Sequence, residues 1–133
     1  MELTDNAYGY AAPIWQRFAR PSHAGSFEAG TDGVVSGEAG SPAARSVLRL
    51  QLRFADGAVA EARFKAYGCP TSIAVGEWIA AWSVGRKAPE LAALSAAHLR
   101  EVLEIPDDRA HCALLGEDAL RAALRGLPNG VAV

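Results

Sequence analysis

The chain has 133 residues, of which 50% are hydrophobic and 21% are charged, so it can fold as one domain around a core. Fifteen acidic and thirteen basic side chains give a net charge of −2, which argues against a nucleic-acid binder. No apolar run is long enough for a membrane helix, and the N-terminus lacks the features of a secretory signal. We therefore expect a single cytoplasmic domain over residues 1–133, with flexible ends of about 12 and about 7 residues.

The N-terminal third contains one helical segment and one long irregular segment. A short helix is predicted over residues 8–20, with Pro13 suited to its start and Pro21 ending it. Residues 21–46 are rich in Gly, Ser, Ala and Pro, which favours a loop with room for a short strand near residues 33–37.

The pattern then changes to strict alternation, which is typical of a β-hairpin. The apolar positions are Leu48, Leu50, Leu52 and Phe54, and the polar positions between them are Arg49, Gln51 and Arg53. Such alternation predicts a strand with one buried and one wet face. Asp56-Gly57 is a strong turn signal, so residues 47–67 are predicted to form an antiparallel hairpin.

The rest of the chain has helical patterns. One helix is predicted from Pro70 to near Gly85, one or two short helices over residues 89–104, and a last helix over residues 111–125 after a break at residues 105–109. Strands followed by helices indicate an α+β fold. We expect a small antiparallel sheet of about three strands with four to five helices packed on one face.

Both cysteines of the chain lie at predicted helix starts. Cys69 follows the hairpin, and Cys112 follows His111 at the start of the last helix. A helix N-terminus lowers a thiol pKa, and two thiolates with one imidazole can form three sides of a tetrahedral metal site. From these residues alone, inert core thiols with a helix-end histidine remain an equal alternative. His23 and His98 are interpreted as ordinary surface or helix histidines.

Residues 61–126 resemble the iron–sulfur cluster assembly scaffolds of the IscU and NifU N-terminal type. The residues that carry this resemblance are Ala62-Arg63-Phe64-Lys65-Ala66-Tyr67-Gly68-Cys69, then His111-Cys112 followed by Leu115, Glu117-Asp118-Ala119 and Ala122-Ala123. Upstream, Gly25-Ser26-Phe27 and Gly40-Ser41-Pro42-Ala43 are similar to family segments. The resemblance implies an IscU-like fold and a scaffold that binds iron and accepts sulfur, with no enzymatic turnover.

The resemblance implies an incomplete ligand set. Cys69, His111 and Cys112 match three of the family's ligand positions, whereas the first cysteine falls on Ala44 and the nearby aspartate on Ser46. A [2Fe–2S] cluster takes four protein ligands, so we expect any cluster to be transient and labile. A single zinc or iron ion with three protein ligands is easier to satisfy, with Ser46 as at most a weak oxygen neighbour.

The resemblance also implies roles and partners. Cys112 matches the family's mobile-loop position and is the candidate sulfur acceptor, while Cys69 and His111 would hold the metal. A cysteine desulfurase is the expected partner. The family's chaperone-recognition segment appears here as Ile105-Pro106-Asp107-Asp108-Arg109, which argues against a dedicated Hsp70-type chaperone. We interpret the two aspartates as caps of the last helix.

Three alternatives stay open at this point. The chain could be a degenerate paralogue that binds one zinc or iron ion and acts as an adaptor or regulator of a cysteine desulfurase. It could be a thiol sulfurtransferase in which Cys112 carries a persulfide and His111 assists proton transfer. It could also be a structural interaction domain with idle cysteines.

Overall fold

The structure is a computed structural model that describes residues 9–41, 43 and 45–127. Most of the expected flexible ends lie outside these residues, as does Ala44, the position that matches the family's first cysteine. The N-terminal helix α1 (Ala12–Ala19) begins with Pro13 in its first turn, as predicted. The rings of Tyr10 and Trp15 stack with their centroids 6.1 Å apart, so a residue that precedes this helix packs against it.

Three antiparallel strands form one sheet in the order β1-β2-β3. They are β1 (Val34–Ser41), β2 (Ser46–Ala55) and β3 (Ala58–Tyr67), and the β2–β3 hairpin turns at Asp56-Gly57 as predicted. Strand β1 is longer than the short strand expected near residues 33–37. Its glycines conceal it in the sequence, but Gly37 is needed: a Cβ there would lie 2.1 Å from the backbone nitrogen of Ala123.

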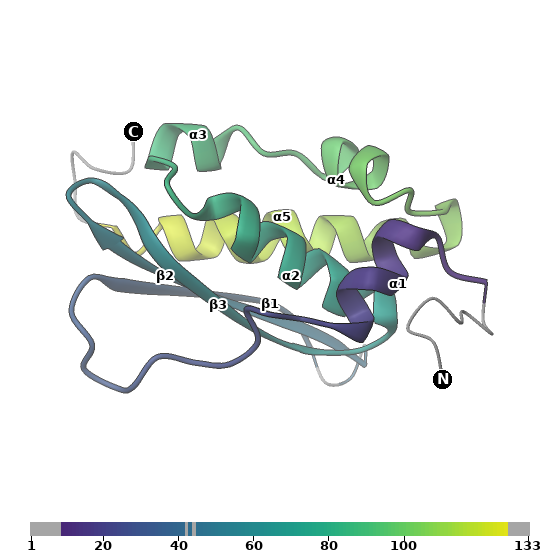
Figure 1. The fold of residues 1–133 in the computed structure, drawn as a ribbon, viewed down its shortest axis with the longest axis horizontal. Helices are drawn as coiled ribbons and strands as arrows, with labels where there is room; N and C mark the ends of the chain where they lie inside the picture. The colour runs from purple at the N-terminus through teal and green to yellow at the C-terminus, as the bar shows by residue number, and fades with distance from the viewer. Residues whose placement is uncertain (1–8, 42, 44, 128–133) are drawn as a thin grey trace.

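Helices cover one face of the sheet in two tiers (Figure 1). The helices are α2 (Pro70–Ser83), α3 (Ala88–Ala92), α4 (Ala96–Val102), the 3₁₀ turn η1 (Asp107–Arg109) and α5 (Ala110–Leu124). Helices α2 and α5 pack on the sheet and on each other, while α3 and α4 lie against α5, and α1 lies against α2. This architecture confirms the α+β expectation. No helix among the described residues is long and apolar enough to cross a membrane.

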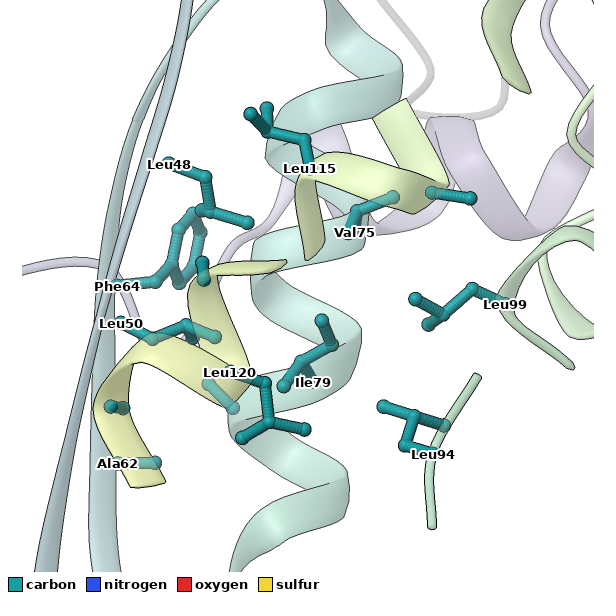
Figure 2. Close-up of a cluster of buried hydrophobic side chains, with 14 of the residues drawn as sticks. Leu48, Leu50, Ala62, Phe64, Val75, Ile79, Leu94, Leu99, Leu115 and Leu120 are labelled. Carbon is teal, nitrogen blue, oxygen red and sulfur yellow. The ribbon is translucent and has the colours of Figure 1, made fainter. Parts of the chain in front are cut away.

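The core lies between the sheet and helices α2 and α5. Figure 2 shows the apolar face of the sheet meeting side chains from both helices. The fully buried members include Leu48, Leu50, Val75, Ile79 and Leu120. The burial of each such side chain contributes about 1.5–3 kcal/mol to stability. This layer holds the first turns of α2 and α5 at fixed positions above one end of the sheet.

The other face of the sheet is not uniformly wet, which corrects one expectation. Gln51 is buried on this face, because its Oε1 accepts the backbone N–H of Phe27 at 2.9 Å and its Nε2 donates to Ser36 Oγ at 3.0 Å. The Arg63 guanidinium also lies over the Phe27 ring, 5.4 Å from its centroid. The segment around Phe27 therefore covers part of the polar face.

The segment before α5 also differs from its interpretation. Asp107 and Asp108 do not cap α5, because they form the η1 turn and the N-cap position belongs to Arg109. Asp107 instead pairs with Arg100 of α4. The 3₁₀ turn moves the aspartates away from the cap position that simple spacing suggested.

Candidate functional site

Glycine allows the chain to turn from β3 into α2 beside Cys69. Gly68 has φ +154°, and a Cβ there would lie 2.6 Å from Ser72 Oγ and 3.2 Å from Ser46 Oγ. Any larger residue would therefore be crowded as well as strained. Cys69 follows as the N-cap of α2, in extended conformation, and is half-buried.

The second cysteine, Cys112, comes from α5 and meets Cys69. We call the site around these two thiols, with Ser46, Gly68 and Ser72, the corner. Cys112 lies in the first turn of α5, is fully buried, and has its Sγ 3.7 Å from Cys69 Sγ. The His111 side chain is exposed, with Nε2 3.6 Å from Cys112 Sγ. The packing of α2 against α5 thus brings together two thiols that are 43 positions apart in the sequence.

The two thiols have opposite acidities. The contact with the Cys112 thiol is the main cause that lowers the pKa of Cys69, to about 4, against a smaller opposing effect of burial. The Ser72 side chain and the backbone N–H groups of Ser72 and Thr71 lower it further. The contact with Cys69 raises the pKa of Cys112, and burial raises it again. The pair therefore shares one proton, with the thiolate on Cys69.

The Cys69–Cys112 and Cys112–His111 distances are each close to the separation expected for two ligands of one metal ion. Two thiolates at about 2.3 Å from one tetrahedral ion lie about 3.8 Å apart, and a thiolate and an imidazole nitrogen lie about 3.6 Å apart. The observed separations of 3.7 Å and 3.6 Å match these values. However, no three His, Cys, Asp or Glu side chains in the described part of the chain form a group that could hold an ion. The two thiols are pre-arranged, and the exposed His111 ring would have to turn to complete a set of three.

Ser46, which matches the position of the family's aspartate, lies at the same corner. Ser46 is the first residue of β2, and its Oγ lies next to Gly68, the residue before Cys69. A hydroxyl there is a weak ligand compared with the carboxylate that the family carries. Ala44 lies outside the described residues.

The prediction that Cys112 is the sulfur acceptor rests on access from a mobile loop, whereas in this conformation Cys112 is helical and buried. Cys69 is the more exposed thiol of the two. A role for Cys112 as acceptor therefore requires the η1–α5 junction to open.

Two other histidines have different surroundings. His98 lies exposed on α4, where its ring meets Trp78 edge-on at 5.9 Å, which confirms the interpretation as a helix histidine. His23 is not an ordinary surface histidine, because its backbone N–H and its Nδ1 both contact the Glu77 carboxylate at 2.7 Å. Ser22 Oγ donates to the same carboxylate at 3.0 Å. We call Ser22, His23 and Glu77 the latch. A glutamate within the apolar α2 pattern was the available sequence signal.

Comparison with known proteins gives consistent relatives. A family profile described as "NifU-like N terminal domain" matches residues 9–130. The iron-sulfur cluster assembly scaffold protein IscU of Escherichia coli K12 is 35% identical over 116 residues, which cover 86% of this chain and 91% of that protein. The IscU of Azotobacter vinelandii is 32% identical over 117 residues, covering 87% and 91%.

Solved structures show the same fold. A putative iron-sulfur cluster assembly scaffold protein for the SUF system, from Fervidobacterium islandicum AW-1, superposes with a TM-score of 0.66 at 17% identity, covering 86% of this chain and 95% of that one. A NifU-like protein (N-terminal) from Brucella abortus gives 0.65 at 22% identity, covering 86% and 91%. At these identities the likeness concerns the fold alone.

Proposed function

Because this chain belongs to the NifU-like N-terminal domain family, we propose that it acts in iron–sulfur cluster assembly, as a scaffold-type protein that receives iron and sulfur. The observation that carries the proposal is the contact between Cys69 and Cys112. Two thiols from separate helices meet at 3.7 Å, at the two positions that match family ligand cysteines. Inert core thiols need no such convergence at two helix N-termini.

The residues of this corner have separate roles in the proposal. Cys69 supplies a thiolate, because its pKa is lowered, and His111 supplies an imidazole from an exposed position. Cys112 accepts sulfur when the η1–α5 junction opens. Iron, sulfide and any cluster are the cargo, and with Ala44 and Ser46 in place of two family ligands we expect that cargo to be labile.

A cysteine desulfurase is the partner that this role requires. Tyr67 directly precedes Gly68-Cys69 and is 63% exposed, so an apolar contact is available beside the thiolate. We do not assign an Hsp70-type chaperone, because Asp107 and Asp108 are exposed where the family has apolar residues. We propose that the protein acts in the cytoplasm, because both cysteines are free thiols and thiols stay reduced in that compartment.

Anaerobic reconstitution tests the function. The reduced protein is incubated with ferrous iron and sulfide, and absorption spectra are combined with iron and sulfide analysis. We expect a cluster that is lost in air, and that neither Cys69→Ser nor Cys112→Ser forms. His111→Ala should weaken it, while His98→Ala, an exposed histidine on α4, serves as the matched control. Failure of the wild type to bind iron and sulfide together would reject the scaffold role.

One observation favours a second candidate, an adaptor that binds a single zinc or iron ion. The two sulfurs and the pair Cys112–His111 have the separations of ligands to one tetrahedral ion, and no thiolate is available at position 44. In the same experiment this candidate predicts one tightly bound metal ion and no sulfide.

A further inference from the structure

Cys69 and Cys112 are the only cysteines of the chain, and each is the other's sulfur neighbour. A sulfur atom loaded onto one of them is therefore within reach of a single second thiol, 3.7 Å away. Here the geometry restricts the next step to one partner.

We propose that Cys69 and Cys112 form a resolving pair that releases the accepted sulfur as sulfide. This inference rests on the proposed function, because sulfur must first be loaded as a persulfide on Cys112. The Cys69 thiolate then attacks Cys112 Sγ. A bond forms between the two Sγ atoms, and the bond between Cys112 Sγ and the outer sulfur breaks.

The step balances without any external oxidant. The electron pair of the broken bond leaves with the outer sulfur, which departs as hydrosulfide and keeps the proton of the persulfide. The outer sulfur is reduced to sulfide, while Cys69 and Cys112 end as a disulfide. A dithiol reductant, such as a thioredoxin-type protein or dithiothreitol, then returns the disulfide to two thiols and is itself oxidised.

The local structure makes the approach short. A disulfide has its sulfurs about 2.05 Å apart, so the pair must close by about 1.7 Å. Once the η1–α5 junction has closed again, Cys69 is the residue that approaches, because it lies outside the helix as the N-cap of α2, whereas Cys112 lies within the first turn of α5. The Cys69 side chain is only half-buried, and the two sulfurs are already in van der Waals contact.

The experiment follows a single loading without reductant. Reduced, metal-free protein is loaded either by a cysteine desulfurase with cysteine or, separately, by inorganic polysulfide, and small molecules are then removed. Released sulfide is measured, and the cysteine peptides are mapped by mass spectrometry under non-reducing conditions. For the wild type we expect stoichiometric sulfide and a peptide pair linked through Cys69 and Cys112.

Two conservative variants separate carrying sulfur from releasing it. Cys69→Ser should keep the persulfide on Cys112 and release sulfide only after dithiothreitol is added. Cys112→Ser should likewise lack spontaneous release. The linked peptide of the wild type is an independent readout, so the test does not depend on the folding of either variant.

The outcomes distinguish this inference from the proposed function. A wild-type persulfide that persists on Cys112, with no linked peptide, would overturn the resolving pair and leave the scaffold role standing. Loading by polysulfide but not by the desulfurase would count against the proposed function, while sulfide release in that arm would still support the pair. Failure to load by either route would reject both.

Discussion

Helix α2 carries two polar clusters that differ in how their groups are satisfied. The latch joins Glu77 to Ser22 and His23 through contacts of 2.7–3.0 Å, which are full hydrogen bonds to a carboxylate. At the N-terminal end of the same helix, Cys69 meets Ser72 and Cys112 at 3.6 and 3.7 Å. Sulfur contacts of this kind are weak, although both clusters are built on one rigid element.

The difference separates structural polar groups from reactive ones. Glu77 is 5% exposed and accepts three hydrogen bonds, so its carboxylate is closed to solvent and bound to partners within the protein. Cys69 is half-buried and its side-chain contacts with Ser72 and Cys112 are long, so a metal ion or a sulfur atom can replace them. Because the buried Glu77 carboxylate is hydrogen-bonded to Ser22 and His23, we interpret the latch as a structural contact that holds the segment after α1 against helix α2.

The largest expected effect is therefore loss of stability at the latch. Glu77→Ala removes the acceptor of three hydrogen bonds and leaves partners from Ser22 and His23 unpaired, and we expect it to lower the unfolding free energy by about 2–4 kcal/mol. Urea unfolding followed by tryptophan fluorescence measures this. Glu101→Ala, at an exposed glutamate on α4, is the matched control and should change the value by less than about 0.5 kcal/mol. Equal effects in the two variants would show that the latch is not a fastening.

A second variant disturbs the cysteine corner through its backbone. Gly68→Ala adds strain at φ +154° and places a Cβ 2.6 Å from Ser72 Oγ, so we expect a loss of about 2–3 kcal/mol and a wider gap between the sulfurs. Gly85→Ala, at φ +86° with open space around its Cβ, adds strain alone and should lose only about 1 kcal/mol. The yield of the Cys69–Cys112 disulfide under mild oxidation reports the gap. A yield in Gly68→Ala equal to that in Gly85→Ala would contradict this reading of the corner.

Local patterns in the sequence account for most of the fold. The alternation in residues 47–67 and the apolar spacing in α2 and α5 predict those elements, because burial on one face leaves a periodic record. Strand β1 was underestimated because its glycines carry no alternation, and its position depends on close contact with α5. The prediction that Asp107 caps the last helix is wrong, because the composition of this segment does not reveal the 3₁₀ turn in which Asp107 lies.

The sequence was enough to identify the two cysteines of the site, but not their distance, burial or acidity. The sequence indicated that Cys69 and Cys112 both begin helices, and the resemblance paired them. The 3.7 Å contact, the sharing of one proton and the burial of Cys112 depend on how α2 packs on α5. His23 was misread because its partner, Glu77, lies 54 positions away.

A third prediction concerns the missing ligands at the corner. Ala44→Cys combined with Ser46→Asp restores the two family ligand types, and we expect the lifetime of a reconstituted cluster to rise at least about tenfold, which corresponds to about 1.4 kcal/mol. Decay of the visible absorption in the presence of a chelator measures the lifetime. Ala97→Asp, at an exposed position on α4, adds the same charge outside the corner and is the control. A wild-type cluster as durable as that of the double variant would show that the missing ligands do not limit the site.

The last prediction tests the sharing of one proton, an effect on reactivity alone. A thiol is a thiolate above its pKa, so a lowered pKa of Cys69 keeps this residue reactive in acid. In metal-free protein, we expect alkylation of Cys69 by iodoacetamide to reach its plateau well below pH 8.5, about where an ordinary thiol is half ionised. The Cys112 contact is the largest cause of the lowered pKa, so Cys112→Ala should move the half-maximal rate to higher pH. Ser72→Ala, which removes a smaller cause, should move it in the same direction by less. A wild-type midpoint near pH 8.5, or one that Cys112→Ala leaves unchanged, would show that the two thiols titrate independently and that the 3.7 Å contact does not couple them.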